Sequence, residues 1–299
     1  MAYKMYLLSF QTAHFGTGKL DSTAFTFTAD RLFSALFIEA IKMGKEEDFL
    51  SLVRQDDFVL SDAFPFVDMP FLPKPIGYPK MDKLPQMNDL VEQRKQAKKT
   101  KKLSYIRLDD FEAFLNGKVL DNKEFGKLNI VTKNQPFMDG HLFQVRTITY
   151  QENVSLYLIA KQSQLFDELM TALQFSGLGG KRSSGYGRFD LEIKDVPEKL
   201  SKHLAFEAVS NVMTLTTALP NDNDLEEAVC NGKYLLAKSS GFAFSNSYQS
   251  NFRKQDFYKF KAGSTFSKSF RGQIADIRPV NFSHPVWNYA KPLFYKLEV

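Results

Sequence analysis

The sequence of 299 residues contains one cysteine, one tryptophan and four histidines. Because Cys230 stands alone, an internal disulfide framework and a cysteine-based zinc site are excluded, and a cytoplasmic location is expected. No apolar run approaches the roughly 18 residues of a membrane span, and the opening residues lack the apolar core of a secretory signal, so neither membrane insertion nor secretion is expected. None of the histidines has neighbours at metal-ligand or catalytic-triad spacing, so no metal or cofactor is predicted.

Two phosphate-binding motifs are also missing. Gly180 and Lys181 are followed by Arg182 where a P-loop needs Ser or Thr, and the earlier glycine of that motif would fall at Phe175. The dinucleotide-binding fingerprint fails because Arg182 stands at the position of its third glycine. No acidic cluster suits magnesium, and no G-G-D-D run is present. These absences disfavour a nucleotide-dependent enzyme.

The composition is that of a folded globular protein with a basic balance. Hydrophobic residues make up 43% and charged residues 24%, which predicts two domains or one large one. Lys and Arg number 39 against 34 Asp and Glu, and the resulting charge of +5 permits nucleic-acid binding. The chain holds 29 Phe and 12 Tyr, which supply rings for a core or for stacking on bases.

Hydrophobic periodicity predicts an α+β fold in two domains. In the first domain, residues 1–195, strands and helices are expected in the split βαβ or ferredoxin-like order, with segments at 2–10, 30–43, 58–60, 154–160, 163–177 and 186–194. Six prolines between Pro65 and Pro85 predict a loop-rich insertion at about 65–145. A helix over 222–229 and strands around 234–244, 257–261 and 293–299 predict a second, β-rich domain over 196–299.

A basic run lies within the predicted insertion. Residues 94–102 carry six cations and no acidic residue. Such a run is typical of a solvated, mobile loop, or of a segment that follows an RNA backbone.

A glycine-rich segment joins the last helix and strand of the first domain, with five glycines in the eleven positions 177–187. Glycine permits positive φ angles and close backbone approach. Cations and hydroxyls in the same segment can bond phosphate or ribose oxygens, so it is predicted to hold an RNA backbone; a mobile turn with solvated cations is the alternative. The candidate residues are Gly177, Gly179, Gly180, Lys181, Arg182, Ser183, Ser184, Gly185, Tyr186 and Arg188.

Two further regions are candidates for RNA contact. Arg31 stands in the first turn of a predicted helix, where a phosphate bound at the helix N-terminus would relieve its conflict with the helix dipole; a surface arginine without a role is the alternative. Between 252 and 271 six aromatic residues interleave with six cations, a mixture typical of a single-stranded RNA face, although a strand core is expected to take about half of the rings. The candidate cations there are Arg253, Lys254, Lys268 and Arg271.

The pattern G-x-G-G-[KR]-x-S-x-G-x-G at 177–187 resembles the glycine-rich loop of the RAMP superfamily, RNA-binding proteins of CRISPR interference and crRNA maturation. Two other stretches agree. Residues 16–36 resemble the loop and first helix of these proteins, and residues 261–286 resemble the closing part of the fourth subunit of type III-A (Csm) complexes. The resemblance covers the first 45 residues, residues 160–195 and the last 45, whereas 65–145 match nothing specific.

The resemblance implies tandem ferredoxin-like (RRM-like) domains, the second degenerate, with a thumb at 65–145. It implies a non-catalytic subunit of a hetero-oligomeric complex that holds the repeat-derived 5′ tag of the crRNA and contacts a large polymerase-like subunit and a backbone RAMP subunit. His14, Gly16, Lys19 and Arg31 would lie beside the glycine loop. The alternative is an endoribonuclease of the same superfamily that processes crRNA precursors with His14, Lys19 and Arg31.

Overall fold

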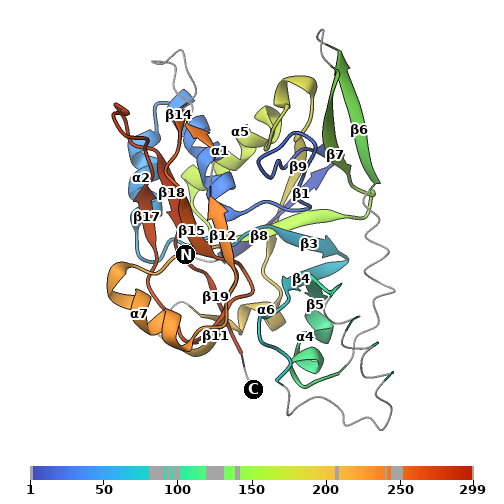
Figure 1. Ribbon diagram of the computed structural model, residues 1–299, viewed down its shortest axis with the longest axis vertical. Coiled ribbons are helices and arrows are strands. Elements are labelled where there is room, and N and C mark those ends of the chain that lie inside the picture. Colours follow the sequence, from blue (N-terminus) through green and yellow to red (C-terminus); the bar gives the residue numbers. More distant parts are fainter. Residues whose placement is uncertain are drawn as a thin grey trace.

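The computed structural model describes residues 3–80, 91, 95, 98, 102–118, 131–138, 142–205, 209–239, 241–243 and 252–297, with the backbone alone at 131–138, 142–144 and 205. Helices and strands are mixed along the chain (Figure 1). In the part that is described, no helix has the length and apolar character to cross a membrane.

A six-stranded sheet, antiparallel at every pairing, forms the centre of the N-terminal half. Its strands in spatial order are β5 (Tyr105–Arg107), β4 (Met69–Pro73), β3 (Phe64–Val67), β8 (Ser155–Lys161), β1 (Tyr3–Phe10) and β9 (Phe189–Asp195). Because side chains alternate along a strand, β1 sends Tyr6 and Leu8 into one hydrophobic cluster and Met5 and Leu7 into another. Both faces of the sheet are therefore covered.

Three helices share the cluster of Tyr6 and Leu8: α1 (Ala29–Lys42), α2 (Glu46–Arg54) and α5 (Gln164–Ser176). The predicted start of α5 at Ser163 is confirmed, because the Ser163 hydroxyl accepts a hydrogen bond from the Phe166 N–H at 3.2 Å. Gly177 follows the helix with a φ of 78°, which glycine adopts readily. The predicted helix over 30–43 is confirmed as α1.

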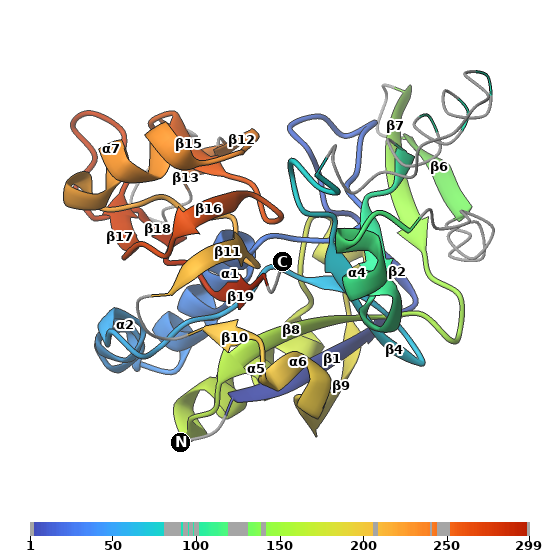
Figure 2. The ribbon, with the colours of Figure 1, turned by 90° about the horizontal axis from the view of Figure 1, so that it is seen from below.

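The C-terminal half is built on a four-stranded antiparallel sheet, in the order β10 (Leu204–Ala205), β19 (Phe294–Lys296), β11 (Ser210–Thr214) and β16 (Thr265–Lys268). The predicted helix over 222–229 is α7 (Asp222–Asn231). Three strand pairs complete this half: β12 (Leu236–Ser239) with β15 (Phe257–Phe260), β13 (Phe242–Ala243) with β14 (Phe252–Arg253), and β17 (Gln273–Asp276) with β18 (Trp287–Ala290). Figure 2 shows this half, in orange and red, beside α1.

The two halves share a hydrophobic core. Met213, Leu215 and Tyr295 from the C-terminal half lie in the same cluster as Met5 and Leu7 of β1. The short helix α6 (Glu198–Ser201) connects the halves, and Leu200 joins that cluster. The helix α4 (Leu108–Leu115) covers the same side of the sheet through Phe111 and Phe114, among others.

The prediction that no regular element would tolerate the prolines after position 64 is wrong. Pro65 lies in β3, and Pro70 and Pro73 lie in β4. Both strands are short, and each proline removes only its own N–H from a ladder whose other groups remain paired. Much of the predicted basic run at 94–102 lies outside the described residues, and the described Lys95, Lys98 and Lys102 are exposed.

A pair of long antiparallel strands, β6 (Val131–Met138) and β7 (Leu142–Thr149), ends the predicted insertion and projects from the body (Figure 1). The short strand β2 (Thr12–Ala13) pairs with β7 and ties this projection to the N-terminal segment. The chain that follows β2 leads directly into the predicted RNA-binding loop at 14–19.

Candidate nucleic-acid interface

The glycine-rich segment is a loop between α5 and β9 that is bonded to the chain after β1. Gly180 N–H donates to the His14 carbonyl at 2.9 Å, and Gly187 N–H donates to the Thr12 carbonyl at 2.9 Å. A Cβ on Gly179 would lie 2.6 Å from the His14 oxygen, and one on Gly187 would lie 2.1 Å from the Leu178 oxygen. Close backbone packing therefore requires glycine at 179 and 187, and the segment between them forms a folded platform.

This loop and α1 enclose a cavity of about 350 Å³, which we call the glycine-loop pocket. It brings together seven of the predicted site residues, which come from three segments of the chain. Its lining is His14, Gly16, Arg31, Ser34, Ala35, Ile38, Gly177, Leu178, Gly179, Gly180 and Arg182. No acidic side chain belongs to this lining, so the pocket is cationic.

Arg31 is the cation at the inner wall of the pocket. Its Nη2 donates to the Gly16 carbonyl at 2.7 Å, which fixes the guanidinium against the loop after β2. Burial lowers the pKa of Arg31, while the carboxylate of Asp30 opposes that shift. A guanidinium retains its charge under such a shift, so Arg31 remains a donor for phosphate or carbonyl oxygens.

His14 is a structural link with one ring edge on the pocket. Its side chain is 4% exposed, and Nδ1 lies 2.7 Å from the Arg146 carbonyl of β7. Because a carbonyl oxygen only accepts, Nδ1 carries a hydrogen and donates it to this oxygen. The ring fills the space beside Gly16 and Gly180, where an added Cβ would come within 2.9 Å and 2.7 Å of it.

Lys19 and the outer part of the glycine loop do not line the pocket. Lys19 is exposed in the turn at 17–21. Of the remaining loop candidates, Ser183, Ser184, Gly185 and Arg188 are exposed on the outer side, whereas Lys181 and Tyr186 are half-buried. A ligand that touches both the pocket lining and these exposed loop residues would have to cross the turn of 3₁₀ helix at Arg182–Ser184.

The N-terminus of α1 already has an anionic partner, which the sequence prediction missed. Asp62 Oδ1 accepts from the Ala29 N–H at 2.8 Å and from the Thr217 N–H at 3.1 Å, and Oδ2 accepts from the Thr217 hydroxyl at 2.6 Å. The helix dipole is therefore balanced by a carboxylate of the protein, and a bound phosphate is not needed there. Asp62 and Ala29 are 33 positions apart, so no local pattern could have revealed this contact.

The predicted RNA face over 252–271 is not a single face. Phe260, Phe266 and Phe270 lie in a hydrophobic cluster, and Lys259 is fully buried. Phe260 ends β15, Phe266 lies in β16 and Phe270 follows β16, so these rings belong to the core of the C-terminal half. Three of the six rings are thus buried, which is the share that the sequence prediction gave to a strand core.

The four candidate cations of that segment are divided between two places. Lys268 and Arg271 line a separate cavity of about 560 Å³, together with Asp56, Asp57 and Lys291 among others. Arg253 is exposed and pairs with Asp256 at 3.2 Å. Burial lowers the pKa of Lys254, which lies close enough to Asp30 for the two charges to interact. Of the four, Lys254 is thus the cation that lies near the start of α1.

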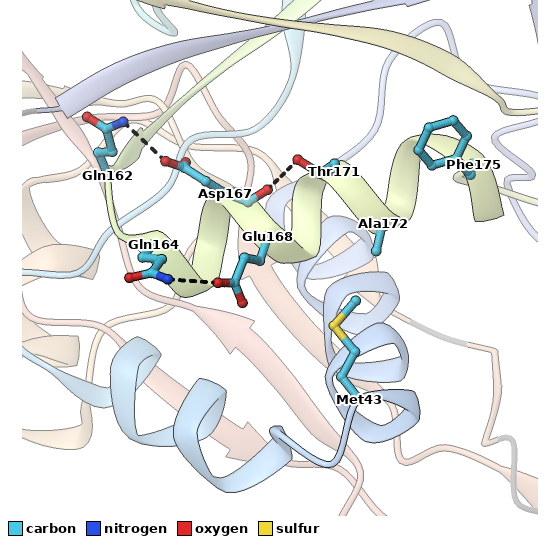
Figure 3. Close-up of a pocket in the computed structure, with 8 residues that line it drawn as sticks. All are labelled: Met43, Gln162, Gln164, Asp167, Glu168, Thr171, Ala172 and Phe175. Carbon is cyan, nitrogen blue, oxygen red and sulfur yellow. Dashed lines mark hydrogen bonds between the residues drawn. The ribbon is translucent and has the colours of Figure 1, made fainter.

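Another cavity, of about 750 Å³, is an open groove along α5 that contains none of the predicted site residues (Figure 3). Its polar side chains are bonded to one another or to neighbours. Gln164 donates to Glu168 at 3.0 Å, and Gln162 donates to Asp167 at 3.1 Å. Its carboxylates make this groove a poor partner for a polyanion, so size does not identify the site. Over the described residues no group of three or more His, Cys, Asp or Glu is placed to hold a metal ion.

Comparison with known proteins shows the family of the chain. The model of the RAMP superfamily matches residues 27–190, and the model described as CRISPR Csm4 C-terminal domain matches residues 207–297. A protein of Streptococcus thermophilus named "CRISPR system Cms protein Csm4" is 57% identical over the full length of both chains. A protein of Mycobacterium tuberculosis with the same name is 33% identical over 99% of this chain and 98% of its own.

Solved structures share the fold. One is the Csm3-Csm4 subcomplex of a type III-A CRISPR-Cas interference complex, in which the matching chain has a TM-score of 0.66 at 18% identity and 99% coverage of this chain and 100% of its own. Another is a Csm1-Csm4 cassette in complex with AMPPNP, with a TM-score of 0.64 at 17% identity and coverage of 99% and 98%. The chain therefore belongs to the Csm4 family of the RAMP superfamily.

Proposed function

We propose that this chain is a non-catalytic subunit of a type III-A CRISPR (Csm) interference complex that holds the 5′ tag of the crRNA at the glycine-loop pocket. The observation that carries the proposal is the pocket itself. Arg31 and Arg182 line a cavity that has no acidic side chain in its wall, and the backbone of the glycine loop lies along it. A cationic cavity with exposed backbone and hydroxyl groups beside it suits phosphate and ribose contacts.

The proposed partners follow from the family. The solved relatives are described as a Csm3-Csm4 subcomplex and a Csm1-Csm4 cassette. We infer that this chain likewise contacts a large polymerase-like subunit and a repeated backbone subunit, and so joins one end of the backbone filament to the large subunit.

The strand order supports the tandem ferredoxin-like arrangement that belongs to this proposal. Within residues 1–195, β3, β8, β1 and β9 are adjacent in that order, with α1 and α5 in the same cluster on one face. In the C-terminal half β19, β11 and β16 are adjacent, and the β17–β18 pair stands in the chain where a second helix would come. The β6–β7 projection is one part of the proposed thumb at 65–145, a range that also contains β4, β5 and α4.

Two variants with the same change in charge test the RNA site. Lys181→Ala/Arg182→Ala removes two cations at the glycine loop, and Lys199→Ala/Lys202→Ala removes two exposed cations near α6. We expect the first to weaken binding of an RNA that carries the 5′ tag by about tenfold or more, and the second to leave it near the wild-type value. Equal affinity of the first variant and the wild type would contradict the site.

Salt dependence gives an independent readout of the same proposal. If about five phosphates are neutralised, log affinity falls with log salt at a slope of about −3.5, and loss of two contacts reduces that slope by about 1.4. An affinity that does not change with salt concentration would contradict binding of RNA phosphates at the glycine-loop pocket.

Incubation of the protein with repeat RNA tests the non-catalytic assignment, because a unique cut that disappears in His14→Ala would favour the endoribonuclease instead.

A further inference from the structure

The first turn of α1 is held by a buried ion pair with the C-terminal half. Asp30 Oδ2 lies 2.8 Å from Lys259 Nζ of β15, and these side chains are 12% and 0% exposed. The same oxygen accepts from the Ser239 hydroxyl of β12 at 2.6 Å and from the Asn288 amide of β18 at 3.2 Å. Three strands of the C-terminal half therefore converge on one carboxylate of the N-terminal half.

Lys259 is fully engaged in this cluster. Besides Asp30, its Nζ donates to Asn288 Oδ1 at 2.9 Å and to the Tyr289 carbonyl at 3.1 Å. Burial by itself would raise the pKa of the Asp30 carboxyl, but the charge and hydrogen bond of Lys259 lower it well below its usual range. The Asp30 carboxyl is therefore ionised, and its contacts with Lys259 fix the directions of both side chains. The Asp30 carboxylate is turned toward β15 and contributes nothing to the wall of the glycine-loop pocket.

A buried ion pair of this kind is a weak source of stability, because the cost of removing two charges from water offsets most of their attraction. The ion pair instead fixes the direction of the Asp30 side chain. The next residue, Arg31, carries the guanidinium at the inner wall of the pocket and bonds Gly16. The backbone that orients Arg31 is thus held on one side by Lys259 through Asp30, and on the other by Asp62 through Ala29.

We propose that Lys259 is a positioning residue for the glycine-loop pocket: through the buried carboxylate of Asp30, the C-terminal half sets the place of Arg31 and thereby the affinity of the pocket for RNA. This inference rests on the proposed function of the pocket. It makes β15 and β18 part of the RNA-binding machinery, although neither strand contributes to the lining.

A double-mutant cycle in the full chain tests the inference, with an RNA that carries the 5′ tag as the probe. We expect Lys259→Met to weaken binding by about tenfold, and Arg31→Ala to weaken it at least as much. In the Arg31→Ala background, Lys259→Met should change the affinity by less than about twofold, because its effect passes through Arg31. The same loss in both backgrounds would overturn the inference, since Lys259 would then act independently of Arg31.

Two companion variants separate positioning from general loss of structure. Lys291 is another buried lysine, 8% exposed, whose Nζ donates to the Val53 and Gln55 carbonyls, and none of these three residues lines the glycine-loop pocket. Lys291→Met should destabilise the fold and leave the affinity within about twofold of wild type at a temperature where the protein is folded. If Lys259→Met fails to fold, Asp30→Asn/Lys259→Met leaves no unpaired buried charge, and it should bind RNA at least about fivefold more weakly than wild type.

The outcomes distinguish this inference from the proposed function. Wild-type affinity in Arg31→Ala and in Lys181→Ala/Arg182→Ala would place RNA elsewhere and would overturn both. Weak binding by Arg31→Ala together with wild-type binding by a folded Lys259→Met or Asp30→Asn/Lys259→Met would overturn the positioning role alone.

Discussion

Asp62 links the start of α1 to the C-terminal half through the hydrogen bonds of its carboxylate. Its carboxylate accepts three hydrogen bonds, one from Ala29 and two from Thr217, and is 5% exposed. Burial raises the pKa of this carboxyl to about 6, although the hydrogen bonds from Thr217 and Ala29 lower it. Ionisation therefore takes place in the folded protein at a higher pH than in the unfolded chain.

The raised pKa of Asp62 predicts a pH dependence of stability. Between the ordinary aspartate pKa of about 4 and about 6, the folded state binds the Asp62 proton more tightly than the unfolded state. The contribution of Asp62 to the free energy of unfolding is present below that range and is lost as the pH rises through it, by about 3 kcal/mol. Urea unfolding at about pH 4 and about pH 7 should show this fall in the wild type relative to Asp62→Asn. A constant difference between the two proteins would contradict it.

At the scale of the element, the glycine loop is a platform whose shape depends on backbone packing. Gly187 has a φ of 81°, and a Cβ there would meet the Leu178 carbonyl at 2.1 Å. Gly185 has a similar φ of 85°, but an added Cβ would meet nothing within 4 Å. Both positions need a positive φ, but only Gly187 lacks space for a Cβ atom. Substitutions at the two positions therefore separate backbone strain from steric clash.

We expect Gly187→Ala to be much more damaging than Gly185→Ala. Both substitutions carry the left-handed strain of about 1 kcal/mol, and only Gly187→Ala adds a clash with backbone that has to move. The free energy of unfolding should fall by about 1 kcal/mol for Gly185→Ala and by about 3 kcal/mol or more for Gly187→Ala, with weaker RNA binding in the latter. Chemical unfolding of both variants measures this, and equal losses would argue against a packed loop.

The helix and strand signals of the sequence predicted the elements that frame the pocket, because these elements depend on local patterns. The apolar stripe of α1, the Ser163 cap of α5 and the glycine density at 177–187 are all visible in the printed sequence. The sequence predicted that about half of the rings at 252–271 lie in a core, and three of the six do; it did not say which three, since which rings of a strand face inward depends on the elements packed against it. Lys259 illustrates the point, because a fully buried lysine has no sequence signal.

At the scale of the whole molecule, the shared core joins the two halves across the predicted boundary at 195. Leu215 of the C-terminal half is fully buried in the cluster that contains Met5 and Leu7. The only tryptophan, Trp287, lies in β18 and stacks against Arg54 of α2 with 4.9 Å between the guanidinium carbon and the ring centre. Fluorescence therefore reports on the contact between the halves.

We expect the chain to unfold in one transition, because neither half can keep its core when the other is lost. Tryptophan fluorescence and far-ultraviolet circular dichroism should give coincident curves. Leu215→Ala should shift both curves together by about 2 to 5 kcal/mol, the cost of a cavity in a packed core. Separate midpoints for the two probes would contradict the shared core and favour two independent domains.

The sequence by itself determined the family, the glycine loop and the cationic character of the site, because these depend on residue types at fixed spacing along one segment. The tertiary structure decided which of the candidates meet. In the structure Arg31 and Arg182 line one pocket and Lys268 and Arg271 line another, and Asp62 lies at the N-terminus of α1. Contacts between residues tens to hundreds of positions apart depend on how the sheet and the shared core bring segments together, and no local pattern encodes that.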